Sequence, residues 1–127
     1  MLEVRDLHAW YGKSHILQGV HLRVGAGECV SLVGRNGVGR STTIRAIMGM
    51  VDARGSVRFK DTEILGLESY RIAHLGLGYV PEERRIFTDL NVMENLEVGR
   101  QPRREGAPHW TPGRLFELFP NLGRMQD

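Results

Sequence analysis

The stretch GRNGVGRST at residues 34–42 constrains this chain more than any other part of its sequence. It has the spacing G-x-x-x-x-G-basic-Ser of a phosphate-binding loop, with Arg40 where lysine is expected. An apolar run at residues 29–33 precedes it, and residues from Ser41 onward have helical periodicity. We therefore expect a strand covered on both faces, then the loop, then a helix.

This layout suits a triphosphate for physical reasons. Small residues let main-chain N–H groups converge on phosphate oxygens, and the start of the helix adds positive potential. The basic side chain reaches the β- and γ-phosphates, and the Ser41 hydroxyl can join the oxygen shell of Mg²⁺. A glycine-rich turn that matches by chance is the alternative, but the glycine offsets and the position between strand and helix favour a phosphate loop.

Arg40 departs from the usual pattern. Arginine keeps the positive charge and can bind phosphate through two N–H groups, but it is longer and planar, unlike the compact ammonium of lysine. Two outcomes are open from the sequence: nucleotide binding with altered geometry, or weakened binding.

Composition excludes several classes of protein. With 127 residues, the chain is at most one ordinary domain, and 41% hydrophobic residues are enough for a core. No apolar run approaches the ~18 residues of a membrane span, and the N-terminus does not resemble a signal peptide. The single cysteine, Cys29, suits a reducing cytoplasm, and its apolar neighbours predict a buried, unreactive thiol.

The charged residues favour no nucleic-acid partner and no metal centre built from histidine. The net charge is only +2, and the basic residues are scattered among acids without interleaved aromatic residues. The five histidines show no metal-ligand spacing, so we assign no site to them.

The remaining pattern predicts an α/β fold. Apolar and polar residues alternate at 2–8, at 20–24 and from Gly55 to residue 60, as in half-buried strands, and 77–80 is a further short apolar run. We expect a short helix at 68–75, one that begins at Asn91, and one that begins at Thr111 and ends before Pro120. Residues 100–110 read as a loop.

Taken together, these residues resemble the ATP-binding subunits of ABC transporters, in the group that takes up branched-chain amino acids and urea. The matching stretches are Tyr11–Val20, Gly27-Glu28, Gly34–Thr42, Ala46–Gly49, Gly78–Phe87 and Glu94–Leu96. They cover most of residues 1–100 in order. The resemblance implies the N-terminal part of one ABC ATPase domain spanning residues 1–127, with antiparallel strands followed by strand, phosphate loop and helix.

The resemblance also implies roles for individual residues. Tyr11 matches the aromatic that stacks on adenine, although a surface turn aromatic is the alternative. Glu82 matches the position, usually glutamine, that senses Mg²⁺ and the attacking water, although it could equally be a solvated acid. Phe87 is either a contact for a transmembrane partner or a core residue. The positions that match the triphosphate cradle are Gly34, Asn36, Gly37, Gly39, Arg40, Ser41 and Thr42.

The implied ligands are ATP and Mg²⁺, the latter through Ser41 and Glu82. The implied partners are transmembrane permease subunits of an importer and, in the full-length family, a second ATP-binding subunit. The implied location is the cytoplasm, peripheral to the inner face of the cell membrane.

Several family motifs do not occur in the chain. The signature motif, the apolar strand that ends in two acids, and the switch histidine would follow Asp127. We therefore expect inefficient ATP hydrolysis by this chain alone and a marginally stable fold. The alternatives are a non-catalytic nucleotide-binding remnant and another phosphate-loop enzyme such as a small kinase or GTPase.

Overall fold

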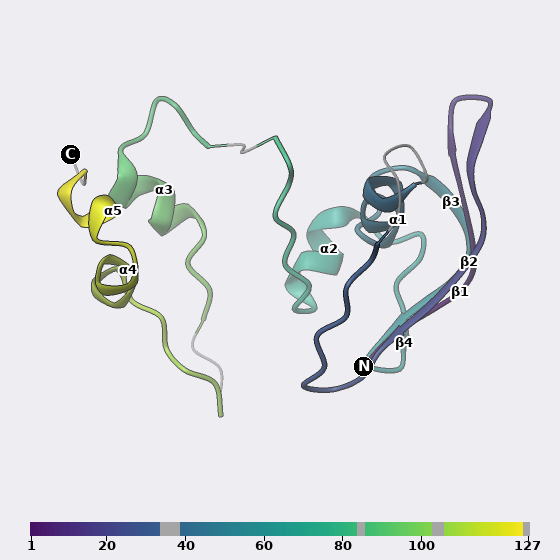
Figure 1. Cartoon of the computed structure of the whole chain (residues 1–127), viewed down its shortest axis with the longest axis horizontal. Coiled ribbons are helices and arrows are strands. Elements are labelled where there is room, and N and C mark those ends of the chain that lie inside the picture. The colour runs from purple at the N-terminus through teal and green to yellow at the C-terminus, as the bar shows by residue number, and fades with distance from the viewer. Residues whose placement is uncertain (34–38, 84–85, 103–105, 126–127) are drawn as a thin grey trace. The chain divides into compact units, whose positions relative to one another are not determined.

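The computed structural model describes residues 1–33, 39–83, 86–102 and 106–125, which form two compact units, 1–79 and 80–127 (Figure 1). The first unit contains strands and helices in alternation, as the α/β prediction required. Its elements are β1 (Leu2–Tyr11), β2 (Ser14–Val24), α1 (Arg40–Ile47), β3 (Asp52–Phe59), β4 (Thr62–Glu63) and α2 (Ser69–His74). The second contains α3 (Val92–Val98), α4 (Pro112–Leu118) and α5 (Pro120–Arg124).

The described strands form one antiparallel sheet in the order β2-β1-β3-β4. The predicted strands at the N-terminus and around residue 57 are confirmed, and a turn at Gly12-Lys13 joins β1 to β2. The alternation that predicted them has its usual cause: Leu7 and Ala9 are buried on one face, whereas His8 and Trp10 between them are only partly buried.

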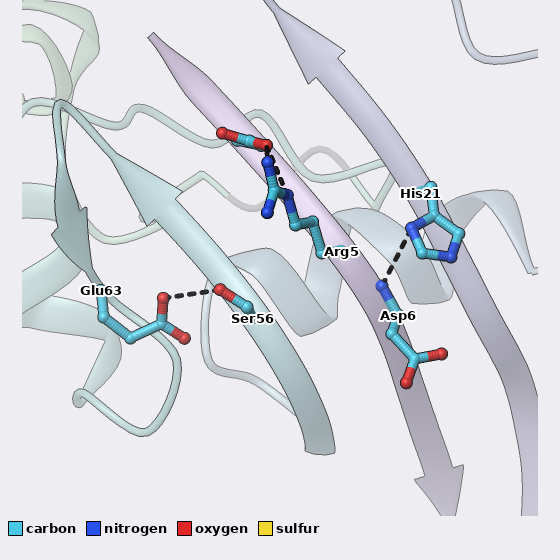
Figure 2. Close-up of polar contacts among 6 residues, drawn as sticks. Arg5, Asp6, His21, Ser56 and Glu63 are labelled. Carbon is cyan, nitrogen blue, oxygen red and sulfur yellow. Dashed lines mark hydrogen bonds and ion pairs between the residues drawn. The ribbon is translucent and has the colours of Figure 1, made fainter.

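A β-bulge interrupts β1 at Asp6. The pairing with both neighbouring strands changes register there, so that Val4 and Leu7, three residues apart, both enter the core. The main-chain N–H of Asp6 donates to Nδ1 of His21 on β2 over 3.2 Å (Figure 2). Strand β3 approaches closely at this point: a Cβ on Gly55 would lie 2.3 Å from the carbonyl oxygen of Asp6.

The core of the first unit lies between the sheet and two helices on the same side of it (Figure 1). The strands contribute an inward-facing apolar layer, and α1 and α2 cover it with Ala46, Ile47 and Ile72. Burial of this apolar surface is the main term that favours the unit's fold, at about 25 cal/mol for each Å² removed from water. The buried hydrophobic residues are Val4, Leu7, Ala9, Leu17, Ala46, Ile47, Met48, Val57, Phe59, Ile64 and Ile72.

Two strand predictions are wrong. Residues 29–33 carry no strand; Cys29 is exposed and Val33 is 81% exposed, so the buried thiol predicted there is also wrong. Residues 77–80 carry no strand either, and Val80 is 93% exposed. A continuous apolar run indicates a strand only where neighbouring strands can pair with it, and the described sheet offers these two segments no partner.

Helices α3 and α4 begin where the sequence predicted. The Asn91 side chain accepts a hydrogen bond from the N–H of Glu94, and the Thr111 side chain accepts one from Arg114, so both residues are N-caps. The last predicted helix ends at Leu118, and Pro120 then begins the separate helix α5. None of the helices within the described ranges combines the length and hydropathy that a membrane span requires.

Candidate functional site

The start of α1 is held tightly against the sheet. Gly39 is buried with a left-handed φ of 93°, and a Cβ there would lie 2.6 Å from Cδ2 of Leu17 on β2. The hydroxyl and the main-chain N–H of Thr43 each donate to the carbonyl oxygen of Gly39 over 2.8 Å. Only glycine combines this backbone with this contact, so the first turn of α1 is fixed in position relative to β2.

Four of the residues predicted to hold the triphosphate lie in the described part of the chain, and they form this N-cap and first turn: Gly39, Arg40, Ser41 and Thr42. Arg40 is half-buried, the Ser41 residue is exposed, and Thr42 is 7% exposed. The first turn holds no acidic side chain, and no side chain caps it. An anion at this end of the helix would therefore meet main-chain N–H groups and the positive end of the helix dipole without competition from a carboxylate. Gly34, Asn36 and Gly37 lie outside the described residues.

Tyr11 lies at the end of β1 and is joined to the same helix. Nη1 of Arg45 in α1 donates to the Tyr11 hydroxyl over 3.1 Å, while 42% of the tyrosine is exposed. This contact brings the predicted adenine-stacking residue and the helix of the phosphate loop into one assembly. A ring that is tethered at its hydroxyl and exposed elsewhere can offer a face to a planar base.

Glu82 and Phe87 belong to the second unit. Glu82 is exposed in a turn after Pro81, and Phe87 is 55% exposed. Of the two predictions for Phe87, burial in the core is therefore wrong. The Asn95 side chain fixes the segment beside it: Oδ1 accepts from the N–H of Phe87 over 2.9 Å, and Nδ2 donates to its carbonyl oxygen over 3.1 Å. Phe87 thus stands exposed on a backbone that is held in place.

Sequence reasoning missed the residues that support this site. In the first unit, Leu17, Thr43 and Arg45 make the contacts described above, but none belongs to a phosphate-loop pattern. In the second unit, Asn95 separately holds the backbone at Phe87. Thr43 was detectable in principle, since a threonine hydroxyl commonly donates to the carbonyl four residues earlier in a helix. The Arg45–Tyr11 contact joins residues 34 positions apart and has no local signal.

Comparison with known proteins decides the family. The family model described as ABC transporter matches residues 17–126 of the chain. The chain belongs to the ABC transporter family. The resemblance drawn from the sequence motifs is confirmed by this match.

Individual relatives of this ABC family member agree with the assignment. BraG of Pseudomonas aeruginosa, a high-affinity branched-chain amino acid transport ATP-binding protein, is 37% identical over 123 residues, which are 96% of this chain and 53% of BraG. LptB of Escherichia coli, a lipopolysaccharide export system ATP-binding protein, is 34% identical over 93% of this chain and 49% of LptB. A solved ATP-binding subunit of an ABC transporter shares 30% identity with a TM-score of 0.74, over 98% of this chain and 52% of that subunit.

These likenesses confirm the predicted fold class. The antiparallel strands, followed by the helix of the phosphate-loop pattern, are those of the N-terminal part of an ABC ATPase domain. This ABC family member spans about half the length of the relatives named above. Activity, substrate and partners are therefore argued below as proposals.

Proposed function

We propose that the chain binds ATP with Mg²⁺ through residues 34–42. The start of α1 carries the proposal: an anchored helix N-terminus with no acidic side chain follows directly on the phosphate-loop pattern. The triphosphate contacts Gly34, Asn36, Gly37, Gly39 and the side chains of Arg40, Ser41 and Thr42. Family membership favours a transporter ATPase over a small kinase or GTPase.

Tyr11 stacks on the adenine in this proposal. Tyr11 lies at the end of β1, and Arg45 joins it to α1. This contact supports the role, because the group that holds the base and the group that holds the phosphates must keep a fixed position relative to each other. Mg²⁺, when bound, would neutralise phosphate charge, and the oxygen donors available for it are the Ser41 hydroxyl and the Glu82 carboxylate. Both residues are exposed, as a ligand to a solvated ion needs to be.

The wider function we propose is that of the ATP-binding component of an importer of branched-chain amino acid type. BraG, with 37% identity, supports the solute class. In this proposal residues 1–127 are the N-terminal portion of one ATP-binding domain. The partners are permease subunits and a second ATP-binding subunit, and the location is cytoplasmic, at the inner face of the membrane. Phe87, exposed on a fixed backbone, suits a permease contact.

Titration of ATP against two variants of the proposed phosphate site, Ser41→Ala and Gly39→Asp, tests nucleotide binding. Ser41→Ala removes the proposed Mg²⁺ ligand, so we expect its affinity for ATP to fall about tenfold in the presence of Mg²⁺ and to change little without it. Gly39→Asp forces a side chain toward Leu17 and sets a carboxylate beside the phosphates, so we expect it to abolish binding. Equilibrium titration with a fluorescent ATP analogue measures both.

Ser14→Ala is the matched control. Ser14 lies in the tripeptide Gly12-Lys13-Ser14, which copies the end of a phosphate loop, but it is exposed at the start of β2. We expect its affinity for ATP to equal that of the parent. If Ser41→Ala and Gly39→Asp both bind as well as the Ser14→Ala variant, the proposal is wrong.

A further inference from the structure

The rings of His8, Trp10 and His15 form a row on the sheet face away from the core. His8 and Trp10 alternate along β1 with the buried Leu7 and Ala9, so their side chains project from the opposite face. His15 on β2 pairs with Trp10 and reaches the same face, where the two rings stack 4.6 Å apart between centroids. Helix α1 packs on the other face of the sheet, so this row is separate from the first turn of α1.

Two ring nitrogens face each other within this row. Nδ1 of His8 lies 2.9 Å from Nε2 of His15, and the two rings are within 27° of parallel. Two nitrogens that each bind one first-row metal ion at about 2.0–2.1 Å lie about 2.9–3.4 Å apart, for bond angles between a right angle and a tetrahedral one. The observed separation is that of a hydrogen bond between the two rings, and it also falls within the chelate range, so a metal ion needs no change in the distance between the nitrogens.

Asp6 orients the His8 ring and favours one of its two neutral tautomers. Its Oδ1 lies 3.1 Å from Nε2 of His8, on the side of that ring away from His15. A carboxylate there accepts a hydrogen bond from Nε2–H of His8. The proton therefore stays on Nε2, and Nδ1, the atom that faces His15, keeps its lone pair. A carboxylate that orients a histidine in this way is the usual outer partner of a histidine metal ligand. The β-bulge helps hold Asp6 in place, since its main-chain N–H is bonded to His21 (Figure 2).

We propose that His8 and His15 chelate a first-row transition-metal dication, Cu²⁺ most tightly, with Asp6 as the positioning residue. Imidazole nitrogen suits Cu²⁺, Ni²⁺ and Zn²⁺, and affinity peaks at Cu²⁺. On binding, the proton on His15 Nε2 is lost or moves to Nδ1 through water, and each nitrogen donates its lone pair. Within the described ranges no group of three or more His, Cys, Asp or Glu side chains could enclose a metal, so water completes the coordination.

The site is accessible, since His15 is exposed and the His8 side chain is 30% exposed. The two nitrogens point toward each other, so each ring must swing by about 35–45° to direct its lone pair at a metal beside the line that joins them. An exposed ring can make such a movement. Mg²⁺ prefers oxygen ligands and should not compete, which distinguishes this site from the proposed nucleotide site.

The stacked indole supplies a direct measurement. Trp10 lies against His15, and Cu²⁺ at His15 would quench its fluorescence. The sequence has two tryptophans, so Trp110→Phe leaves Trp10 as the only tryptophan, and excitation at a wavelength that tyrosine does not absorb observes it alone. In the full chain without an affinity tag, we expect CuCl₂ to quench Trp10 with a saturable one-site curve. ZnCl₂ should compete for the site, and MgCl₂ at the same concentration should not.

Variants assign the effect to these residues. We expect His15→Gln and His8→Gln each to weaken Cu²⁺ binding by at least about tenfold, and Asp6→Asn to weaken it by about tenfold. His74→Gln, in α2 and outside the row, is the matched control and should bind like the parent. Far-UV circular dichroism checks that each variant keeps the sheet. Equal Cu²⁺ affinity in the parent and a folded His15→Gln would overturn the proposal, as would quenching that never saturates.

Discussion

At the scale of single residues, the Tyr11–Arg45 contact links the two ends of the proposed nucleotide site. The hydroxyl of Tyr11 holds it to α1 and leaves the rest of the ring partly exposed. Stacking needs the ring, whereas the tether needs the hydroxyl. Replacing the ring and replacing the hydroxyl therefore separate the two contributions.

Tyr11→Leu removes the stacking face. We expect its ATP affinity to fall by about 5- to 150-fold, the equivalent of about 1–3 kcal/mol for a base stacked on an aromatic ring. Tyr11→Phe keeps the ring and loses the bond from Arg45 to the hydroxyl, so its affinity should fall by less than about fivefold. Titration with a fluorescent ATP analogue measures both. Equal affinities for Tyr11→Leu and the parent would remove Tyr11 from the site.

Arg40 is the second residue to test. A planar guanidinium replaces the compact ammonium that this position usually carries in phosphate loops, and the residue is half-buried at the start of α1. We expect Arg40→Lys to tighten ATP binding several-fold, because the compact ammonium is the group that the phosphate-loop pattern carries at this position. Isothermal calorimetry gives the two dissociation constants. Equal or weaker binding by the lysine variant would show that the loop has adapted to arginine.

At the scale of elements, the contact between β1 and β3 depends on Gly55. Its φ is 122°, and a Cβ there would lie 2.3 Å from the carbonyl oxygen of Asp6, a main-chain atom that cannot move aside. We expect Gly55→Ala to lower the free energy of unfolding by about 3–5 kcal/mol, from backbone strain and the clash together. Denaturant titration followed by circular dichroism measures the change.

Gly66→Ala is the control for backbone strain without a clash. Gly66 also has a positive φ, 94°, but a Cβ there meets nothing within 4 Å. Its cost should be about 1–2 kcal/mol. A Gly55→Ala variant no less stable than Gly66→Ala would mean that the bulge at Asp6 relaxes freely.

The elements also show what the sequence could predict. Strand β1 and residues 20–24 of β2 were predictable because alternation is a local signal, and the caps Asn91 and Thr111 are local as well. The earlier part of β2, from Ser14, was not predicted. Residues 29–33 were wrongly predicted as a strand. An apolar run indicates that a strand there would be buried, but it does not show which neighbouring strands would pair with it. The pair His8–His15 escaped notice because its spacing is set by strand pairing across a hairpin. In the candidate site, the loop pattern and the Thr43–Gly39 bond are local, whereas the contacts of Leu17 with Gly39 and of Arg45 with Tyr11 are long-range.

At the scale of the whole molecule, an exposed apolar segment should govern behaviour in solution. Val30, Leu32 and Val33 are 47%, 40% and 81% exposed within one short stretch. Apolar patches of this kind favour association. We expect the 127-residue chain to self-associate with rising concentration and to melt over a broad temperature range. Sedimentation velocity should show less association for Leu32→Ser combined with Val33→Ser, whereas a sharp, reversible transition of a monomeric parent would contradict this expectation.

The central claim is that main-chain amides at the start of α1 bind the phosphates of ATP. The most direct test is to follow the ¹⁵N–¹H amide resonances of the chain while ATP with Mg²⁺ is added. The account predicts that the largest shifts fall on residues 34–42, that Tyr11 shifts with them, and that the Gly39→Asp variant shows neither change. Resonances of residues 34–42 that stay in place at saturating nucleotide, or shifts confined to other parts of the chain, would contradict it.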